Sequence, residues 1–261
     1  MRSWIRRRWS GTVSAEAEGP VGWVPTPPLD NSRAVQALLI VLSVTAGCTD
    51  IIGFLVLNGL FTAHITGNLV ILAAHIVGGG EPQIAPMLSV PVFIVMVGLT
   101  RLLAGGLESI GLTSLRPLLL LQLLLLAGFL VLCVAAGPRI DPNATNAILA
   151  GMLGVSAMAV QNALVQISLK GAPSTAVMTS NVTRFAMDVG EVVLGGDRAD
   201  VAKARNRATR TLPVIVGFTV GCGLGAACEA ALGRWSLALP AGLALLAFAM
   251  GFAAEPDDGP R

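Results

Sequence analysis

Long apolar runs separated by short polar connections extend from residue 34 to residue 254. An α-helix rises 1.5 Å per residue, so about 20 apolar residues cross the ~30 Å hydrocarbon core of a bilayer. A membrane-spanning strand would alternate polar and apolar residues, whereas the run from Leu118 to Leu126 is broken only by Gln122. The pattern predicts an all-α, multi-pass transmembrane bundle with helices at 35–57, 60–78, 86–107, 117–137, 144–168, 174–194, 211–232 and 235–254.

Two of these predicted helices, 60–78 and 174–194, are the least apolar, and each contains a cluster of Thr and Asn residues. A helix that breaks near such a cluster could enter and leave the membrane on the same face. The sequence therefore predicts about eight helices, with six to eight membrane crossings.

The composition fits a membrane protein. Hydrophobic residues make up 54% of the chain and charged residues 12%, about half the share usual in soluble domains. The mean hydropathy is +0.76. The net charge is only +2 and no basic groove is present, so the expected partner is the lipid bilayer and not a nucleic acid.

The placement of the basic residues predicts the orientation. With eight crossings and a cytoplasmic N-terminus, only three basic residues fall in outer segments: Arg116, Lys170 and Arg234. The inner segments then carry twelve, namely Arg2, Arg6, Arg7, Arg8, Arg33, Arg139, Arg198, Lys203, Arg205, Arg207, Arg210 and Arg261. This positive-inside bias predicts that both termini are cytoplasmic.

Three polar segments complete the predicted organisation on the cytoplasmic side. Residues 1–33 form an Arg- and Pro-rich tail, and 255–261 form a short acidic tail, both expected to be disordered. The mixed charges of the basic loop 195–210 suit a short surface helix.

A short segment with polar residues at alternate positions occurs twice, about 112 residues apart. Residues 62–68 have the sequence TAHITGN, and residues 175–181 have TAVMTSN. Asp50 precedes the first copy, and Gln161 and Asn162 precede the second. The chain is therefore predicted to contain repeat one at 34–137 and repeat two at 144–254. Four crossings per repeat would make the repeats parallel.

Asp50 lies within an apolar helix, where an ionised carboxylate costs about 2.5–3.5 kcal/mol at the helix centre. It should face a polar cavity, pair with a base or hold its proton. A role in a substrate or proton pathway and a structural pairing with a neighbouring helix both satisfy this requirement. Arg101 could form an ion pair with Asp50, or its side chain could extend outward to the membrane–water interface.

The first copy places His64, Thr66 and Asn68 at every second position, so these side chains cannot share one face of a regular helix. Gly59 and Gly67 flank them. A distorted segment that turns these groups toward one cavity is predicted, because irregular backbone at membrane depth must be satisfied by protein or water. The alternative is that they form hydrogen bonds between helices.

The second copy continues into a charged stripe that spaces Asn181, Arg184, Asp188 and Glu191 along one helix face. Arg184 and Asp188 are four residues apart and could neutralise each other. A structural ion pair and an ion pathway are both consistent with this spacing. The candidate pathway residues are Asp50, His64, Thr66, Asn68, Gln161, Asn162, Thr179, Asn181, Arg184 and Asp188.

The sequence favours no enzyme. It has no Ser/His/Asp arrangement with a glycine elbow, no paired-histidine metal motif and no phosphate-binding loop. Cys48, Cys133, Cys222 and Cys228 lie in apolar segments without metal-ligand spacing. No catalytic residue, metal or cofactor is therefore expected.

Two segments carry a resemblance to a known family: AGCTDIIGF at 46–54 and FTAHITGNL at 61–69, followed by VQNA at 160–163 and TSN at 179–181. Over 35–254 the chain resembles the YoaK-type family of uncharacterised bacterial multi-pass membrane proteins. Thr179-Ser180 stands where that family usually shows Thr-Gly, and Gln122 stands where an acidic residue is common. The resemblance implies a multi-pass protein of the bacterial inner membrane, often with six helices, and no established activity.

Paired polar segments at matching depth favour a small secondary transporter or permease, possible partners being an unidentified small solute and a second copy of the chain. Proton coupling would involve Asp50. The alternative is a non-transporting membrane scaffold or assembly factor in which the same residues form hydrogen bonds between helices.

Overall fold

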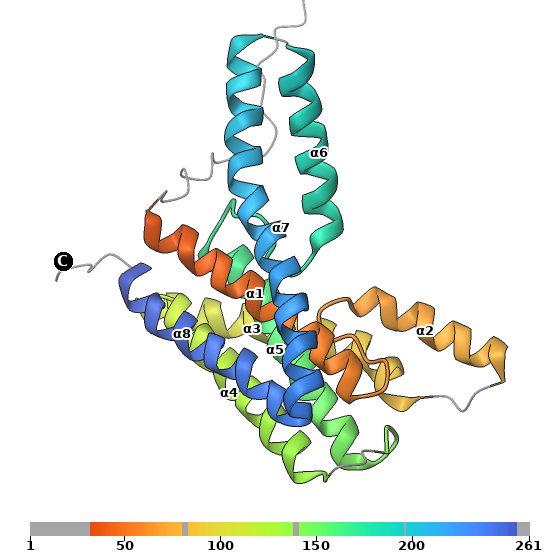
Figure 1. The fold of residues 1–261 in the computed structure, drawn as a ribbon. Coiled ribbons are helices and arrows are strands. Elements are labelled where there is room, and N and C mark those ends of the chain that lie inside the picture. Colours follow the sequence, from red (N-terminus) through yellow and green to blue (C-terminus); the bar gives the residue numbers. More distant parts are fainter. Residues whose placement is uncertain (1–31, 80–82, 138–140, 196, 255–261) are drawn as a thin grey trace, which may run out of the picture.

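The computed structural model describes residues 32–79, 83–137, 141–195 and 197–254. These residues form a helical bundle without strands (Figure 1), which confirms the predicted all-α, multi-pass architecture. Nearly all of the predicted tails lies outside the described residues. The helices are α1 (Arg33–Val56), α2 (Ile65–Gly78), α3 (Ile84–Ser109), α4 (Leu115–Ala135), α5 (Thr145–Ser168), α6 (Met178–Leu194), α7 (Arg198–Leu232) and α8 (Ala238–Ala254), with a 3-10 turn, η1 (Gly233–Leu237), before α8.

Three predicted helix starts are wrong by more than a turn. The helices expected from residues 60 and 174 begin only at Ile65 and Met178. The helix expected at 211–232 begins at Arg198, so the expected separate surface helix is the first part of α7. Asp197 caps this helix by accepting a hydrogen bond from the backbone N–H of Ala199. The polar stretch that follows is rich in Ala and Arg, which favour helix. The helix therefore continues from the polar stretch into the apolar one.

The inter-helix contacts fix the direction of each helix relative to α1. Gly151, near the start of α5, faces Leu57 and Leu60 beyond the end of α1. Ten residues later, Gln161 donates a hydrogen bond to the carbonyl of Leu42. The α1 and α5 helices are therefore antiparallel.

The α7 helix runs parallel to α1, because Gly217 packs on Ile40 and Gly225 packs on Cys48. The α4 helix is antiparallel to α5: Ser114 meets Ser168 at one end, and Gly128 meets Leu153 toward the other.

The remaining directions follow from contacts at the helix ends. Arg234 in η1 donates to the carbonyl of Cys133, and Gly251 lies against Leu119, so α8 is antiparallel to α4. The α3 helix packs along α5 and begins beside it, where the N–H of Ile84 donates to Asn143. The order α1, α3, α4, α5, α7, α8 thus alternates strictly in direction.

This alternation corrects the predicted orientation of the repeats. In the described residues, five stretches are long and apolar enough to cross a membrane, and the last, 198–254, turns back at η1. These stretches contain six helices, α1, α3, α4, α5, α7 and α8, whereas α2 and α6 each return the chain to the side of the bundle that it came from (Figure 1). The first helices of the two repeats, α1 and α5, are antiparallel, so the second repeat begins at the opposite end of the bundle. The repeats are inverted and not parallel.

The packing pairs agree with a two-fold relation between the repeats. The α1 helix packs on α7 and α8, and α5 packs on the equivalent α3 and α4. The α2–α3 pair corresponds to α6–α7. The inversion also moves Arg116 and Lys170 to the side where α1 begins, since each lies at the end of a helix on that side.

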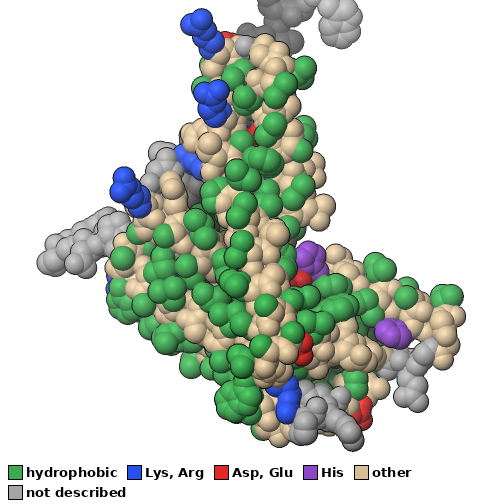
Figure 2. Space-filling model, in the orientation of Figure 1, with side chains coloured by type: hydrophobic (Ala, Val, Ile, Leu, Met, Phe, Trp, Pro, Cys, Tyr) green, Lys and Arg blue, Asp and Glu red, His purple; other side chains and the backbone are tan. Residues whose placement is uncertain are grey.

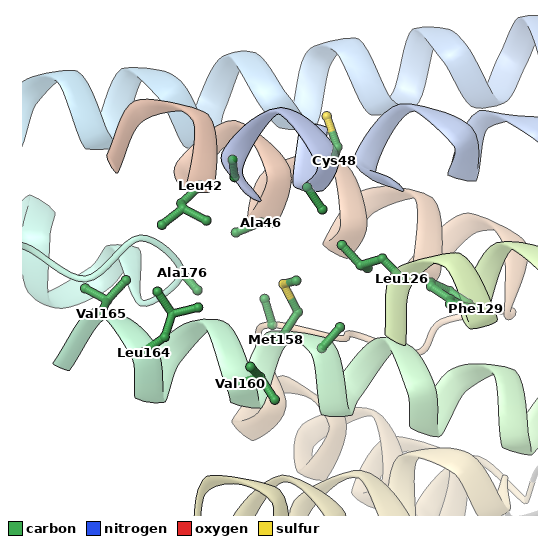
Figure 3. Packing of buried hydrophobic residues seen from close by; sticks show 14 of the residues in the cluster. Leu42, Ala46, Cys48, Leu126, Phe129, Met158, Val160, Leu164, Val165 and Ala176 are labelled. Atoms are coloured by element: carbon green, nitrogen blue, oxygen red, sulfur yellow. The ribbon is translucent and has the colours of Figure 1, made fainter. Parts of the chain in front are cut away.

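The core lies where α1 and α5 face each other at the centre of the bundle. Figure 3 shows Leu42 and Ala46 of α1 opposite Met158 and Leu164 of α5, and all four side chains are fully buried. The α1–α7 contact is closer still, because Gly47 and Gly221 let the two backbones touch. Small residues give this close approach in lipid, where no hydrophobic force drives helices together.

Replacing Gly47 by Ala should destabilise the bundle by about 1–3 kcal/mol, because the added methyl group would overlap the carbonyl oxygen of Phe218. Thermal unfolding in detergent measures the change. Gly223→Ala on the same helix pair is the control, since a methyl group there meets nothing within 4 Å. Equal melting temperatures for the two variants would contradict the described α1–α7 contact.

The described helix directions predict from which side of the membrane an engineered cysteine can be labelled. The test uses a chain in which the four native cysteines are replaced. Thr113→Cys and Arg205→Cys should be labelled from one side by a membrane-impermeant maleimide, and Trp235→Cys from the other. All three positions are exposed. Labelling of Thr113→Cys and Trp235→Cys from the same side would contradict these directions and support the eight-crossing prediction.

Candidate functional site: two re-entrant loops

The chain re-enters the bundle after α1. The helix ends at Val56, yet Thr62 and Ala63 lie beside Asp50, six residues before that end. At 1.5 Å per residue, the loop returns to a depth of about 9 Å from the helix end. Thr62 and Ala63 are buried, so residues 57–64 form a re-entrant loop, named loop one here. The break predicted near the Thr/Asn cluster is thus present, and α2 starts only at Ile65.

The carboxylate of Asp50 holds loop one by its backbone. Its Oδ1 accepts hydrogen bonds from the N–H groups of Thr62 at 2.9 Å, Ala63 at 2.7 Å and His64 at 3.4 Å. The Thr62 hydroxyl adds a longer contact at 3.4 Å. These backbone groups belong to no helix, and Asp50 itself is only 4% exposed. The carboxylate therefore satisfies donors that would otherwise be costly inside the bilayer.

The second oxygen of Asp50 pairs with His64. The Oδ2–Nδ1 distance is 2.5 Å, and the side chains are 5% and 40% exposed respectively. With Asp50 ionised, the carboxylate can only accept, so Nδ1 carries the hydrogen. The imidazole ring also packs edge-on against Phe218 of α7. His64 thus connects a buried carboxylate to the surface of the bundle.

Asn68 fixes the exit of loop one. Its side chain accepts from the N–H of Phe61 at 2.9 Å and donates to the carbonyl of the same residue at 2.8 Å. It also donates to the hydroxyl of Ser89 on α3 at 2.9 Å. The buried amide therefore ties the loop to the neighbouring helix of repeat one.

Repeat two contains the equivalent loop, residues 169–177, named loop two. Gln161 on α5 donates to the Thr175 hydroxyl at 2.8 Å, as Asp50 contacts Thr62 in the first copy. Asn181 donates to the carbonyl of Ser174, seven residues earlier, and Asn68 makes the same seven-residue contact to Phe61. The two loops share one construction.

The two loops differ in charge. Gln161 replaces Asp50 in its contact with the loop, and Val177 aligns with His64. Gln161 is held by neutral groups: it donates to the carbonyl of Leu42 and accepts from Gln122 at 2.7 Å. Only loop one therefore contains an ionisable pair.

The described structure does not bring all the predicted residues together. Thr66 and Thr179 are exposed on the first turns of α2 and α6. Asn162 donates to Met158 within its own helix. Arg101 lies near Glu108 at 3.7 Å instead of Asp50. The predicted residues thus divide into two separate loop centres and the charged stripe of α6.

That stripe pairs differently from the prediction. Asp188 is bound by Arg207 of α7, whose Nε and Nη2 lie 3.0 and 2.6 Å from Oδ1. Arg184 is exposed, and the predicted pair with Asp188 is not formed. Asp188 is 3% exposed, and its Oδ2 has no hydrogen-bond partner among the described residues. The ion pair joins α6 to the polar part of α7 in a helical hairpin.

Several contributors were not among the predicted site residues. Thr62 and Thr175 recur in the repeated segment, which was the available signal. Gln122 was visible as the polar break in its apolar run, but its partner was not; Ser89 and Arg207 gave no local signal. The partners of these three residues lie 39, 21 and 19 residues away in the chain.

The geometry describes polar centres that hold irregular backbone, one of which contains the Asp50–His64 pair. The described residues contain no group of three or more His, Cys, Asp or Glu side chains placed to hold a metal ion.

A family model described as a protein of unknown function, DUF1275, matches residues 38–250. The chain belongs to the DUF1275 family. Neither a curated protein nor a solved structure matches it. The matched region of this DUF1275 protein contains both re-entrant loops and reaches into all six crossing helices.

In this DUF1275 protein, Arg207→Gln should lower the free energy of unfolding by about 1–2 kcal/mol. It leaves the buried Asp188 carboxylate without its partner, although Arg207 itself is half-exposed, which reduces the effect. Arg184→Gln removes the same charge from an exposed site and should change stability by less than about 0.5 kcal/mol. Denaturation of both variants in detergent compares them; a larger effect for Arg184→Gln would support the Arg184–Asp188 pair instead.

Proposed function

We propose that this DUF1275 protein is a small secondary transporter of the bacterial cell membrane, coupled to protons. The observation that carries the proposal is the pair of inverted repeats, each with a broken, re-entrant segment. Inverted repeats with discontinuous helices are a recurring plan of secondary transporters, whose substrate and ion sites lie at such breaks. The proposal includes no enzymatic activity. Within the DUF1275 family, the chain is proposed to belong to the YoaK-type proteins that its sequence resembles.

The proposed coupling acts through Asp50. When Asp50 is ionised, its Oδ1 accepts three backbone N–H bonds from loop one. Protonation removes the negative charge, and hydrogen bonds to a charged acceptor are roughly twice as strong as neutral ones. Proton uptake through His64 would therefore loosen loop one, while the neutral loop two stays closed. This difference gives the two repeats separate tasks in alternating access.

The proposed orientation places the N-terminus in the cytoplasm. The side on which α1 begins carries Arg33, Arg116, Lys170 and the basic part of α7, whereas Arg234 lies on the opposite side. The inverted topology strengthens the bias that the sequence predicts, because Arg116 and Lys170 join the basic side.

The closed state of both centres favours one rival, a membrane scaffold or assembly factor. Asp50 is 4% exposed, and Asn68 and Gln161 are fully buried with partners from the chain. In a scaffold these hydrogen bonds would serve stability alone.

Reconstituted vesicles that enclose a pH-sensitive dye separate the two functions. A panel of small solutes added outside should produce solute-dependent acidification with the wild-type protein. Asp50→Asn should reduce the rate at least tenfold, because Asn cannot take up a proton. Thr66→Val, an exposed change on the neighbouring turn, should leave the rate unchanged.

Thermal unfolding of the same preparations provides the opposing outcome. A scaffold predicts no acidification with any solute and a lower melting temperature for Asp50→Asn. Undiminished acidification by a folded Asp50→Asn protein would remove Asp50 from the proposed coupling.

A further inference from the structure

A cavity of about 210 Å³ opens on the side where α1 begins. It lies between the first turns of α1, the part of α7 around Pro213 and the Pro173 segment of loop two. Leu39 lines it, and Leu42, three residues further along α1, accepts the hydrogen bond from Gln161. The cavity therefore ends about 4–5 Å along the helix from the centre of loop two.

The polar lining of this cavity is suited to an anion. Its polar side chains are Gln36, Asn206, Thr209 and Arg210, and none of the described residues that line it is acidic. Arg210 is half-buried, and its Nε donates to the Asn206 side chain at 3.1 Å. A guanidinium has five N–H donors in a planar fork that matches a carboxylate. No ion pair between Arg210 and a carboxylate occurs among the residues that the structure describes.

The rest of the lining is apolar, and the volume limits the ligand. Leu39 and Ile40 of α1 and Val214 of α7 are among its apolar lining residues. The volume equals about seven water molecules at ~30 Å³ each. A cavity of this size accommodates a small molecule and not a two-chain lipid. Figure 2 shows Lys and Arg side chains gathered toward this end of the visible face, which would attract anions from solution.

We propose that this cavity binds a small monocarboxylate with a short apolar chain, with its carboxylate on Arg210 and its chain against Leu39 and Val214. The further statement that this ligand is the transported solute rests on the proposed transport function. Loop two would then be the barrier between the cavity and the centre of the bundle, because Pro173 precedes Ser174 and Thr175, which anchor the loop.

Isothermal titration of the purified full-length protein in neutral detergent tests the site, with pentanoate as the probe. Pentanoate should bind once per chain, and pentanamide, which has the same shape without the charge, at least about tenfold more weakly. Arg210→Gln should weaken pentanoate binding by a similar factor, as expected for the loss of a charge-assisted hydrogen bond. Arg205→Gln is the matched control, because Arg205 lies on the same helix but outside this cavity, and should change the affinity less than twofold.

The opposing outcomes are distinct. Absence of pentanoate binding, equal binding of pentanoate and pentanamide, or equal loss in the two arginine variants would overturn the proposal. Binding of phosphatidylglycerol but not pentanoate, lost in Arg210→Gln, would identify a lipid headgroup as the anion and overturn it as well. If Arg210→Gln does not fold, Ile40→Trp, which fills the cavity rim, should abolish pentanoate binding; retained binding would count against the site.

Vesicle flux separates this inference from the proposed function. Arg210-dependent pentanoate binding without pentanoate uptake would support the site and refute transport of this ligand. Solute-dependent acidification without pentanoate binding would support transport and refute the site.

Discussion

The hydrogen bonds from loop one to Asp50 are the interaction on which the first half of the bundle depends. A chain that leaves a helix and returns inside a membrane exposes backbone N–H groups that lipid cannot satisfy. One carboxylate oxygen accepts three of them, so a charge that would be costly alone becomes part of a satisfied centre. The same arrangement fixes where α2 begins and brings His64 against α7.

Loop two is held in the bundle by a neutral side chain, the Gln161 amide. Gln161 bonds to α1 through Leu42, to α4 through Gln122 and to its own loop through Thr175. An amide both donates and accepts, so it can join three elements, whereas an ionised carboxylate only accepts. Loop two is thereby tied to more of the bundle, and loop one depends on a group whose charge can change.

The inverted relation of the repeats follows from these loops. Because α2 and α6 turn back, each repeat runs the length of the bundle three times and the second copy is turned over. The α6–α7 hairpin then projects from the side where α1 begins, held by the Arg207–Asp188 pair (Figure 1). The cavity at its base adjoins loop two, so the basic end of the molecule and the neutral loop belong to one region.

The sequence alone predicted the apolar helices, the duplication and the option of a break near the Thr/Asn cluster, because hydropathy and repeated polar residues are local properties of the chain. Only the tertiary structure decided that α2 and α6 turn back, since a window of about 20 residues cannot show whether a polar break reverses the chain. The tertiary structure also shows that Asp188 pairs with Arg207 and not with Arg184, and that Gln122 donates a hydrogen bond to Gln161. Such partners lie tens of residues apart, so only the packing of the helices selects them.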